Sequence, residues 1–191
     1  MNKLSDRMWI TRKARINMEK RLNFNYKICT YLIPWYSILL IAVSIIPSNV
    51  DSSIRNTFSV LGSIIVLVVS LLLSQKDFKQ ECRQVKEQYI SIGKLISDAY
   101  SAENRNDSTA NIEDQYDQLL RETENHSEYD YKKVIIQCFL RKTTNPSKNN
   151  TVPNPSFFEW SYFIIRNIVV WLIIILIYLV IPIGIFIWLL S

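Results

Sequence analysis

The feature that most constrains the fold is an uncharged apolar run near the end of the chain. Residues 168–190 read IVVWLIIILIYLVIPIGIFIWLL and contain no charged side chain. A helix needs about 20 apolar residues to cross the hydrocarbon core of a bilayer, and soluble helices seldom stay apolar on every side over this length. The run therefore predicts a transmembrane helix within residues 164–191, with a kink at Pro182 and Gly184.

Two further apolar runs lie close together in the first half of the chain. They are YLIPWYSILLIAVSIIP at residues 31–47 and TFSVLGSIIVLVVSLLLS at residues 57–74. A short polar loop separates them, so they predict a tight pair of transmembrane helices within residues 28–74. The first run is not expected to be a cleaved signal peptide, because it lies deep in the chain and a second run follows at once.

The distribution of basic residues predicts the orientation of these helices. Residues 1–27 hold eight Lys and Arg side chains, whereas the loop at residues 48–56 holds only Arg55. Cytosolic flanks of membrane helices are enriched in Lys and Arg. We therefore expect a multi-pass protein of the inner (cytoplasmic) membrane, with its N-terminus and residues 75–163 in the cytosol. The 48–56 loop and the C-terminal Ser191 are expected outside.

Residues 1–27 are predicted to form a basic cytosolic helix that lies on anionic lipid headgroups. Each Lys or Arg near such a surface contributes roughly 1 kcal/mol. The headgroup-facing side chains are expected to be Arg7, Arg12, Lys13, Arg15, Lys20 and Arg21. Nucleic acid is not expected as a direct ligand, because these charges lie against the membrane and the aromatic residues form no stacking motif.

After the second run, apolar residues recur at alternating steps of four and three, which is the spacing of a heptad seam. This cytosolic packing seam consists of Phe78, Cys82, Val85, Tyr89, Ile92 and Ile96. The second transmembrane helix is therefore expected to continue past residue 75 into the cytosol and to pack there against other helices. Two arrangements fit the spacing equally: a coiled coil between subunits, and a helix folded onto its own domain.

The remaining sequence completes an all-α integral membrane protein with a cytosolic helical domain at residues 75–142. SAENRNDSTAN, residues 101–111, predicts a polar loop, and two amphipathic helices are expected between it and residue 142. The candidate caps of the second of these helices are Asn125, Ser127 and Asp130. Residues 143–163 predict a linker to the third transmembrane helix, and no strand pattern is present.

A stripe of small hydroxyl side chains runs along the second apolar segment. It consists of Ser59, Ser63, Ser70 and Ser74. Small residues and hydroxyls mark helix interfaces in lipid, so the stripe is a candidate membrane interface or pore lining. Ser37 and Ser44 in the first segment are expected to supply the facing partner. The alternative is that each serine bonds a backbone carbonyl of its own helix and has no further role.

Several function classes are disfavoured by composition. The three glycines form no phosphate-binding loop, and His126 and the three cysteines have no metal-ligand spacing, so no cofactor or metal is expected. No ionisable residue lies inside an apolar run, which disfavours a coupled transporter.

No nucleophile or base is organised for catalysis, so the chain is not expected to be an enzyme. A channel-like oligomeric effector and a membrane anchor or scaffold for a cytosolic partner remain.

Short motifs in this sequence resemble those of the SLATT domain. They are Met8, Trp9, Thr11, Arg15 and Glu19 to Leu22, followed by Tyr116, Leu119, Leu120, Glu124 to Ser127, Asp130 and Tyr131. Together with the helical architecture, the resemblance covers residues 7–142. SLATT domains are membrane effectors found beside nucleotide-generating SMODS enzymes, SLOG sensors and some reverse transcriptases in prokaryotic conflict systems.

The resemblance implies a homo-oligomeric, pore-forming or membrane-disrupting effector. Such an effector kills or arrests an infected cell, which is abortive infection as an antiviral defence. Its partner would be a nucleotide-signalling enzyme, a SLOG-type sensor or a reverse transcriptase. The family pattern has two transmembrane helices, so the run at residues 168–190 is an addition or a subfamily feature.

Overall fold

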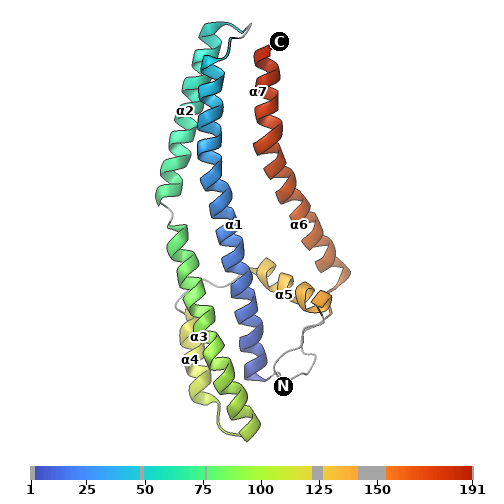
Figure 1. Ribbon diagram of the computed structural model, residues 1–191. Helices are drawn as coiled ribbons and strands as arrows, with labels where there is room; N and C mark the ends of the chain where they lie inside the picture. Colours follow the sequence, from blue (N-terminus) through green and yellow to red (C-terminus); the bar gives the residue numbers. More distant parts are fainter. Residues whose placement is uncertain (1–2, 48–49, 76, 122–126, 142–153, 191) are drawn as a thin grey trace. The chain divides into compact units, whose positions relative to one another are not determined.

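The computed structural model describes residues 3–47, 50–75, 77–121, 127–141 and 154–190. Within these ranges the chain is helical apart from short turns and contains no strand, which confirms the all-α prediction (Figure 1). The elements are α1 (Leu4–Ile45), α2 (Ser52–Gln75), α3 (Phe78–Arg105), α4 (Ala110–Arg121), α5 (Glu128–Arg141), α6 (Phe157–Ile175), the π-helix η1 (Leu176–Val180) and α7 (Ile181–Leu190).

The chain divides into two compact units. We call Met1–Asn23 with Phe78–Ile165 the polar unit, and Phe24–Asp77 with Arg166–Ser191 the apolar unit. α1 and α6 each contribute residues to both units. The basic N-terminal segment therefore belongs to the same unit as α3, α4 and α5.

Three stretches of helix are long and apolar enough to cross a membrane. They lie within Leu4–Ile45, Ser52–Arg105 and Phe157–Leu190. Hardly any residue of their most apolar windows is buried inside the chain, and the exposed side chains are mainly Ile, Leu, Val, Phe and Trp. A contiguous apolar surface of this extent is unfavourable in water, so acyl chains are the medium that suits these helices.

The junction after the second apolar run differs from the sequence expectation. One helix was predicted to pass from the membrane into the cytosolic seam, but α2 ends at Gln75 and α3 begins at Phe78. Asp77 belongs to neither helix, and Lys76 lies outside the described residues. Asp is favoured immediately before a helix, which gives a physical reason for a new helix start at this position.

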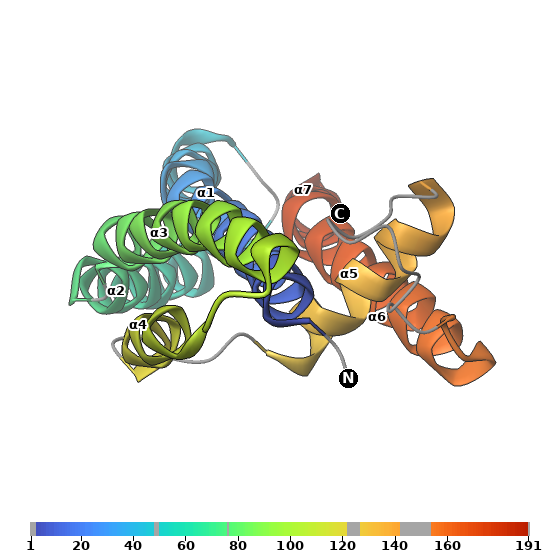
Figure 2. The same ribbon diagram turned by 90° about the horizontal axis from the view of Figure 1, so that it is seen from below.

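The polar unit has its core between the first part of α1 and the helices α3, α4 and α5. α3 and α4 lie side by side in both views (Figures 1 and 2). One cluster joins Ile92 and Ala99 of α3 to Leu4, Met8 and Tyr116. Two smaller clusters consist of Val85 with Met18 and Leu22, and of Ala14 with Val134 and Cys138. The apolar side of α3 is thus covered by helices of the same chain.

The end of α3 also differs from the prediction of a loop at residues 101–111. The helix continues to Arg105 and ends in a paired hydrogen-bond motif around Asn106. The Asp107 N–H bonds the Ala102 carbonyl at 2.9 Å, and the Asn106 N–H bonds the Glu103 carbonyl at 3.3 Å. Asn106 has a positive φ of 59°, the left-handed conformation that Asn tolerates at a helix C-terminus.

The third apolar helix is irregular just before the predicted kink residues. Residues Leu176–Val180 form the π-helix η1, and Pro182 lies one residue into α7. The Ile181 N–H bonds the Leu176 carbonyl, five residues earlier, in place of the usual four. A single π turn of this kind is rare and is often found at functional sites.

Candidate functional site

The predicted serine stripe lies in a groove between α1 and α2. The groove has a volume of about 670 Å³. Its hydroxyl-bearing lining residues are Ser37, Ser44, Ser59, Ser63 and Ser70, and the rest of its lining is aliphatic. The structure therefore brings the two serines of α1 together with three of the four stripe residues of α2. Ser74 is not among the lining residues.

Most of the serine hydroxyls in this groove bond the backbone of their own helix. Ser37 Oγ donates to the Ile33 carbonyl at 2.9 Å, and Ser63 Oγ donates to the Ser59 carbonyl at 2.8 Å. Ser44 Oγ donates to the Ile41 carbonyl at 2.8 Å. The Ser59 Oγ is buried without a hydrogen-bond partner in the described structure. The bonds of Ser37, Ser44 and Ser63 are those of the alternative in which each serine bonds its own helix. The role of the groove at an interface or in a pore stays a prediction.

Gly62 allows α1 and α2 to approach each other closely. A Cβ atom at this position would lie 2.5 Å from Leu40 Cδ2. Any larger residue would force the Leu40 side chain to move, since that separation is far below van der Waals contact. Small residues have this role at many helix contacts in membranes, where close backbone approach replaces the hydrophobic effect.

Two tyrosines join the third apolar helix to α1. Tyr36 Oη donates to the Ile177 carbonyl at 2.7 Å, and Tyr178 Oη donates to the Ile28 carbonyl at 2.6 Å. The Ile177 carbonyl needs such a donor because its usual partner, the Ile181 N–H, bonds Leu176, and the next residue along is Pro182, which has no N–H. The π turn and the proline together create the acceptor that Tyr36 uses.

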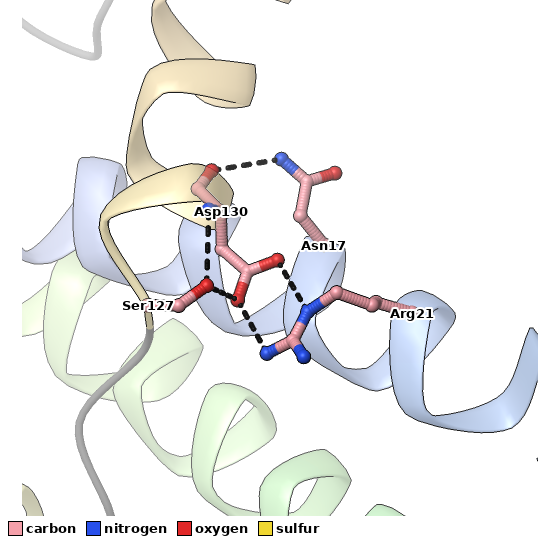
Figure 3. Close-up of polar contacts among 4 residues, drawn as sticks. All are labelled: Asn17, Arg21, Ser127 and Asp130. Carbon is pink, nitrogen blue, oxygen red and sulfur yellow. Dashed lines mark hydrogen bonds and ion pairs between the residues drawn. The ribbon is translucent and has the colours of Figure 1, made fainter. Parts of the chain in front are cut away.

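In the polar unit, an arginine and a buried aspartate form a bidentate pair (Figure 3). Arg21 Nε lies 3.2 Å from Asp130 Oδ1, and Arg21 Nη2 lies 3.0 Å from Oδ2. Asp130 is 0 % exposed. Ser127 Oγ donates to Asp130 Oδ2 at 2.7 Å, and the Asp130 N–H bonds Ser127 Oγ at 3.4 Å. Of the predicted caps of α5, Ser127 caps the helix with Asp130 as its reciprocal partner.

A second polar group connects α1 to α3 and α4. The buried guanidinium of Arg15 donates to Gln88 Oε1, and Gln88 Nε2 donates to the Leu119 carbonyl at 3.2 Å. Thr11 Oγ1 and Tyr116 Oη are 2.7 Å apart. Burial lowers the pKa of Arg15 and raises the pKa of Tyr116. Both shifts have the sign expected when desolvation disfavours a charged form.

These contacts correct part of the prediction of a headgroup-facing arm. Arg15 is 0 % exposed, and Arg21 is bound to Asp130. Arg12 Nε donates to the Tyr89 carbonyl at 3.2 Å. Burial in the polar unit removes Arg15 from the surface, and this is the physical reason that Arg15 does not face lipid. Arg12 and Arg21 bond acceptors of the same unit but stay partly exposed, so their headgroup contact stays a prediction.

The remaining residues of the arm lie closer to solvent. Arg7 forms an exposed ion pair with Glu113 at 3.1 Å. Lys13 Nζ lies 5.2 Å from the centre of the Trp9 ring, and Lys20 is exposed. A headgroup contact of these three residues stays a prediction.

The predicted seam of α3 lies partly in the core of the polar unit. Val85 is 2 % exposed and Ile92 is 0 % exposed. Cys82 packs beside Val85, and Ile96 packs beside Ile92. Phe78 and Tyr89 are half-buried. α1 therefore covers Val85 and Ile92 within the same chain, and a coiled coil between subunits through the rest of the seam stays a prediction.

The short sequence motifs are brought together by the fold of the polar unit. The early motif supplies Thr11, Arg15 and Arg21, and the later motif supplies Tyr116 and Asp130. Gln88 and Asn17, whose Nδ2 lies 3.4 Å from the Asp130 carbonyl (Figure 3), were missed by sequence reasoning. The one sequence feature that could have indicated Gln88 and Asn17 is that each is a polar residue on an otherwise apolar helix face.

Three comparisons with known proteins bear on this arrangement. The sequence model of the family described as "SMODS and SLOG-associating 2TM effector domain family 5" matches residues 1–188. The match includes the third apolar helix up to Trp188, so that helix lies within the family pattern. No curated protein and no solved structure matches the chain. Within the described residues, no group of three or more His, Cys, Asp or Glu side chains is placed to hold a metal ion.

Proposed function

The chain belongs to the SMODS and SLOG-associating 2TM effector domain family 5, and from that premise we propose that it is a pore-forming effector of a prokaryotic anti-phage system. In this proposal several copies assemble in the inner membrane and make it permeable, so that an infected cell dies or stops growing. The chain acts by binding and assembly and carries no catalytic activity of its own.

The observation that carries this proposal is the hydroxyl-lined groove between α1 and α2. Among the residues that the structure describes, five serines and no charged side chain line it. Lipid gives little drive for helix association, so hydroxyls and small residues favour docking of a helix from a second copy. The absence of charge among the lining residues supports a nonselective or hydrophobically gated opening over a selective ion filter.

Leakage from proteoliposomes tests the proposal directly. The full chain would be reconstituted into vesicles loaded with a small fluorescent dye, and dye release would be measured against the protein-to-lipid ratio. We expect release to rise more steeply than linearly with this ratio, because several copies form one opening. Intact vesicles at every ratio, together with unchanged membrane potential and growth in cells expressing the chain, would overturn the proposal.

Substitutions within and outside the groove show which surface is used. Ser63→Leu and Ser70→Leu place bulk in the groove, whereas Val68→Leu changes a residue of α2 that does not line the groove. We expect the two serine variants to lose dye release or to change the subunit number, and Val68→Leu to behave as wild type. Equal behaviour of all three variants would exclude the groove from the assembly.

The alternative function is a membrane anchor or scaffold that holds a cytosolic partner through the polar unit. It predicts no leakage by the chain alone, so the vesicle experiment separates the two functions. In either case the family description leads us to propose a nucleotide-signalling enzyme or a SLOG-type sensor as the cellular partner. A reverse transcriptase is a further candidate. Co-purification with such a neighbour from its native operon tests this association.

A further inference from the structure

A second cavity of the apolar unit lies between α1, α2 and the η1–α7 segment. It has a volume of about 490 Å³ and is open at the surface of the apolar unit. It shares Ile33, Leu40 and Val66 with the serine groove, but none of the groove's serines lines it. Its lining side chains are aliphatic or aromatic and include no charged group. Apart from the hydroxyl of Tyr36, which already bonds the Ile177 carbonyl, no described side chain of the lining carries a polar atom.

Two contacts hold the third helix beside the other two and leave the cavity between them. Tyr36 bonds Ile177 at 2.7 Å, and Phe58 packs against Trp188 with ring centroids 5.8 Å apart. The lining on the third helix runs from Ile177 to Ile185, which is about 12 Å of helix at 1.5 Å per residue. The helices are thus joined at both ends of this stretch and separated along it.

The size and chemistry of the cavity indicate what fills it. Voids much larger than a water molecule are rare in protein interiors, and water enters a cavity only where it finds several polar partners. The helices around this cavity are of membrane-spanning length and apolarity, so the medium at its opening is acyl chains. One leaflet of a hydrocarbon core about 30 Å thick is about 15 Å deep, which is close to the length of the lined stretch.

We propose that this cavity is a binding site for one acyl chain of a membrane phospholipid, with the headgroup outside the cavity. A free fatty acid suits the site less well, because the described lining of the cavity offers no cationic side chain to pair with its carboxylate. The acyl chain gains van der Waals contact with the three helices, which an empty space would forfeit. The inference depends on the helices lying in a membrane and is independent of pore formation.

Photo-crosslinking in vesicles tests the site. The full chain would be reconstituted with a phospholipid that carries a photoactivatable group in its acyl chain, and the labelled residues would be located by mass spectrometry. Val69→Trp and Ile65→Trp fill the cavity from α2, since both residues line it. Val68→Trp and Leu72→Trp are matched controls on the same helix, because neither residue lines the cavity and both are exposed.

We expect labelling of the lining residues to fall severalfold in Val69→Trp and Ile65→Trp and to stay at the wild-type level in the two controls. Equal labelling of the lining in all four variants would overturn the proposal. So would labelling by a photoactivatable free fatty acid in place of the phospholipid. A changed subunit number in only the two filled variants would assign the cavity to a second copy of the chain and also overturn it. Dye release is not a readout here, so failure of the proposed pore leaves this test intact.

Discussion

At the scale of single residues, the basic side chains of the N-terminal segment lie in two different environments. Arg15 and Arg21 act inside the polar unit, where they bond Gln88 and Asp130. Lys20, between them in the chain and on the same helix, is exposed. Sequence reasoning assigned all of these charges to lipid headgroups because composition does not reveal which face of a helix is covered. The acceptor Asp130 lies more than a hundred residues away.

The pair of Arg21 and Asp130 is expected to stabilise the polar unit. Removing one partner of a buried ion pair leaves a charge without compensation and costs about 3–5 kcal/mol. Because Arg21 keeps 26 % of its side chain exposed, we expect Arg21→Ala to lower the free energy of unfolding by about 2–3 kcal/mol. Denaturant unfolding of the purified protein, followed by circular dichroism, measures this change.

The matched control for this variant is Lys20→Ala, which removes a neighbouring positive charge from an exposed position. Surface charges contribute little, so its effect is expected to stay below about 1 kcal/mol. Equal losses in the two variants would mean that net charge matters and the pair does not. Near wild-type stability of Arg21→Ala would contradict the structural role of Asp130.

The tyrosine bonds of the apolar unit lead to a second residue-level prediction. Tyr36→Phe removes the donor to the Ile177 carbonyl while keeping the ring. Hydrogen bonds between membrane helices contribute about 0.6 kcal/mol on average and up to about 1.7, and we expect a loss of about 1 kcal/mol here. Tyr31→Phe is the control, since Tyr31 is on the same helix and 66 % exposed. Unfolding in mixed detergent micelles compares the two, and equal stability would contradict the role of this bond.

At the scale of helices, the seam of α3 links periodicity to packing. Val85 and Ile92 are seven residues apart and both lie in the core. Val85→Asp would bury a carboxylate among Met18, Leu22 and Cys82, and we expect it to cost about 3–5 kcal/mol. Gln84→Asp introduces the same charge on the exposed side of α3 and should cost less than about 0.5 kcal/mol. Thermal unfolding compares the stability of the two variants. Similar midpoint temperatures would contradict burial of the seam.

The sequence predicts which segments form helices, but it predicts less accurately the residues at which those helices begin and end. The apolar run predicts α2, the heptad spacing predicts α3, and amphipathic faces predict α4 and α5, because all of these signals are local. The sequence predicts too early an end for α3, because the Ser, Asn and Asp residues after residue 100 are typical of loops. The chain instead continues its helix to Arg105 and ends at Asn106. The π turn at Leu176–Val180 had no local signal beyond Pro182, because the Tyr36 hydroxyl that bonds Ile177 comes from another helix.

At the scale of the whole molecule, the number of membrane crossings determines where the two ends lie. The family description specifies two transmembrane helices, whereas the described part of this chain contains three helices long and apolar enough to cross. An even number of crossings returns the chain to its starting side, and an odd number does not. The third helix therefore places the C-terminus opposite the N-terminus if all three helices cross, and the sidedness of the two ends shows whether the number of crossings is odd or even.

Single-cysteine labelling tests this sidedness in a variant whose native cysteines are replaced by serine. The positive-inside rule counts Lys and Arg near the membrane whatever their side chains bond, so the burial of Arg15 and Arg21 does not change the expectation. Asp51→Cys should react with a membrane-impermeant maleimide in intact cells, and so should a cysteine appended after Ser191. Asp107→Cys, in the turn after α3, should react only after permeabilisation. Labelling of Asp107→Cys in intact cells would reverse the orientation, and protection of the appended cysteine would reduce the crossings to two.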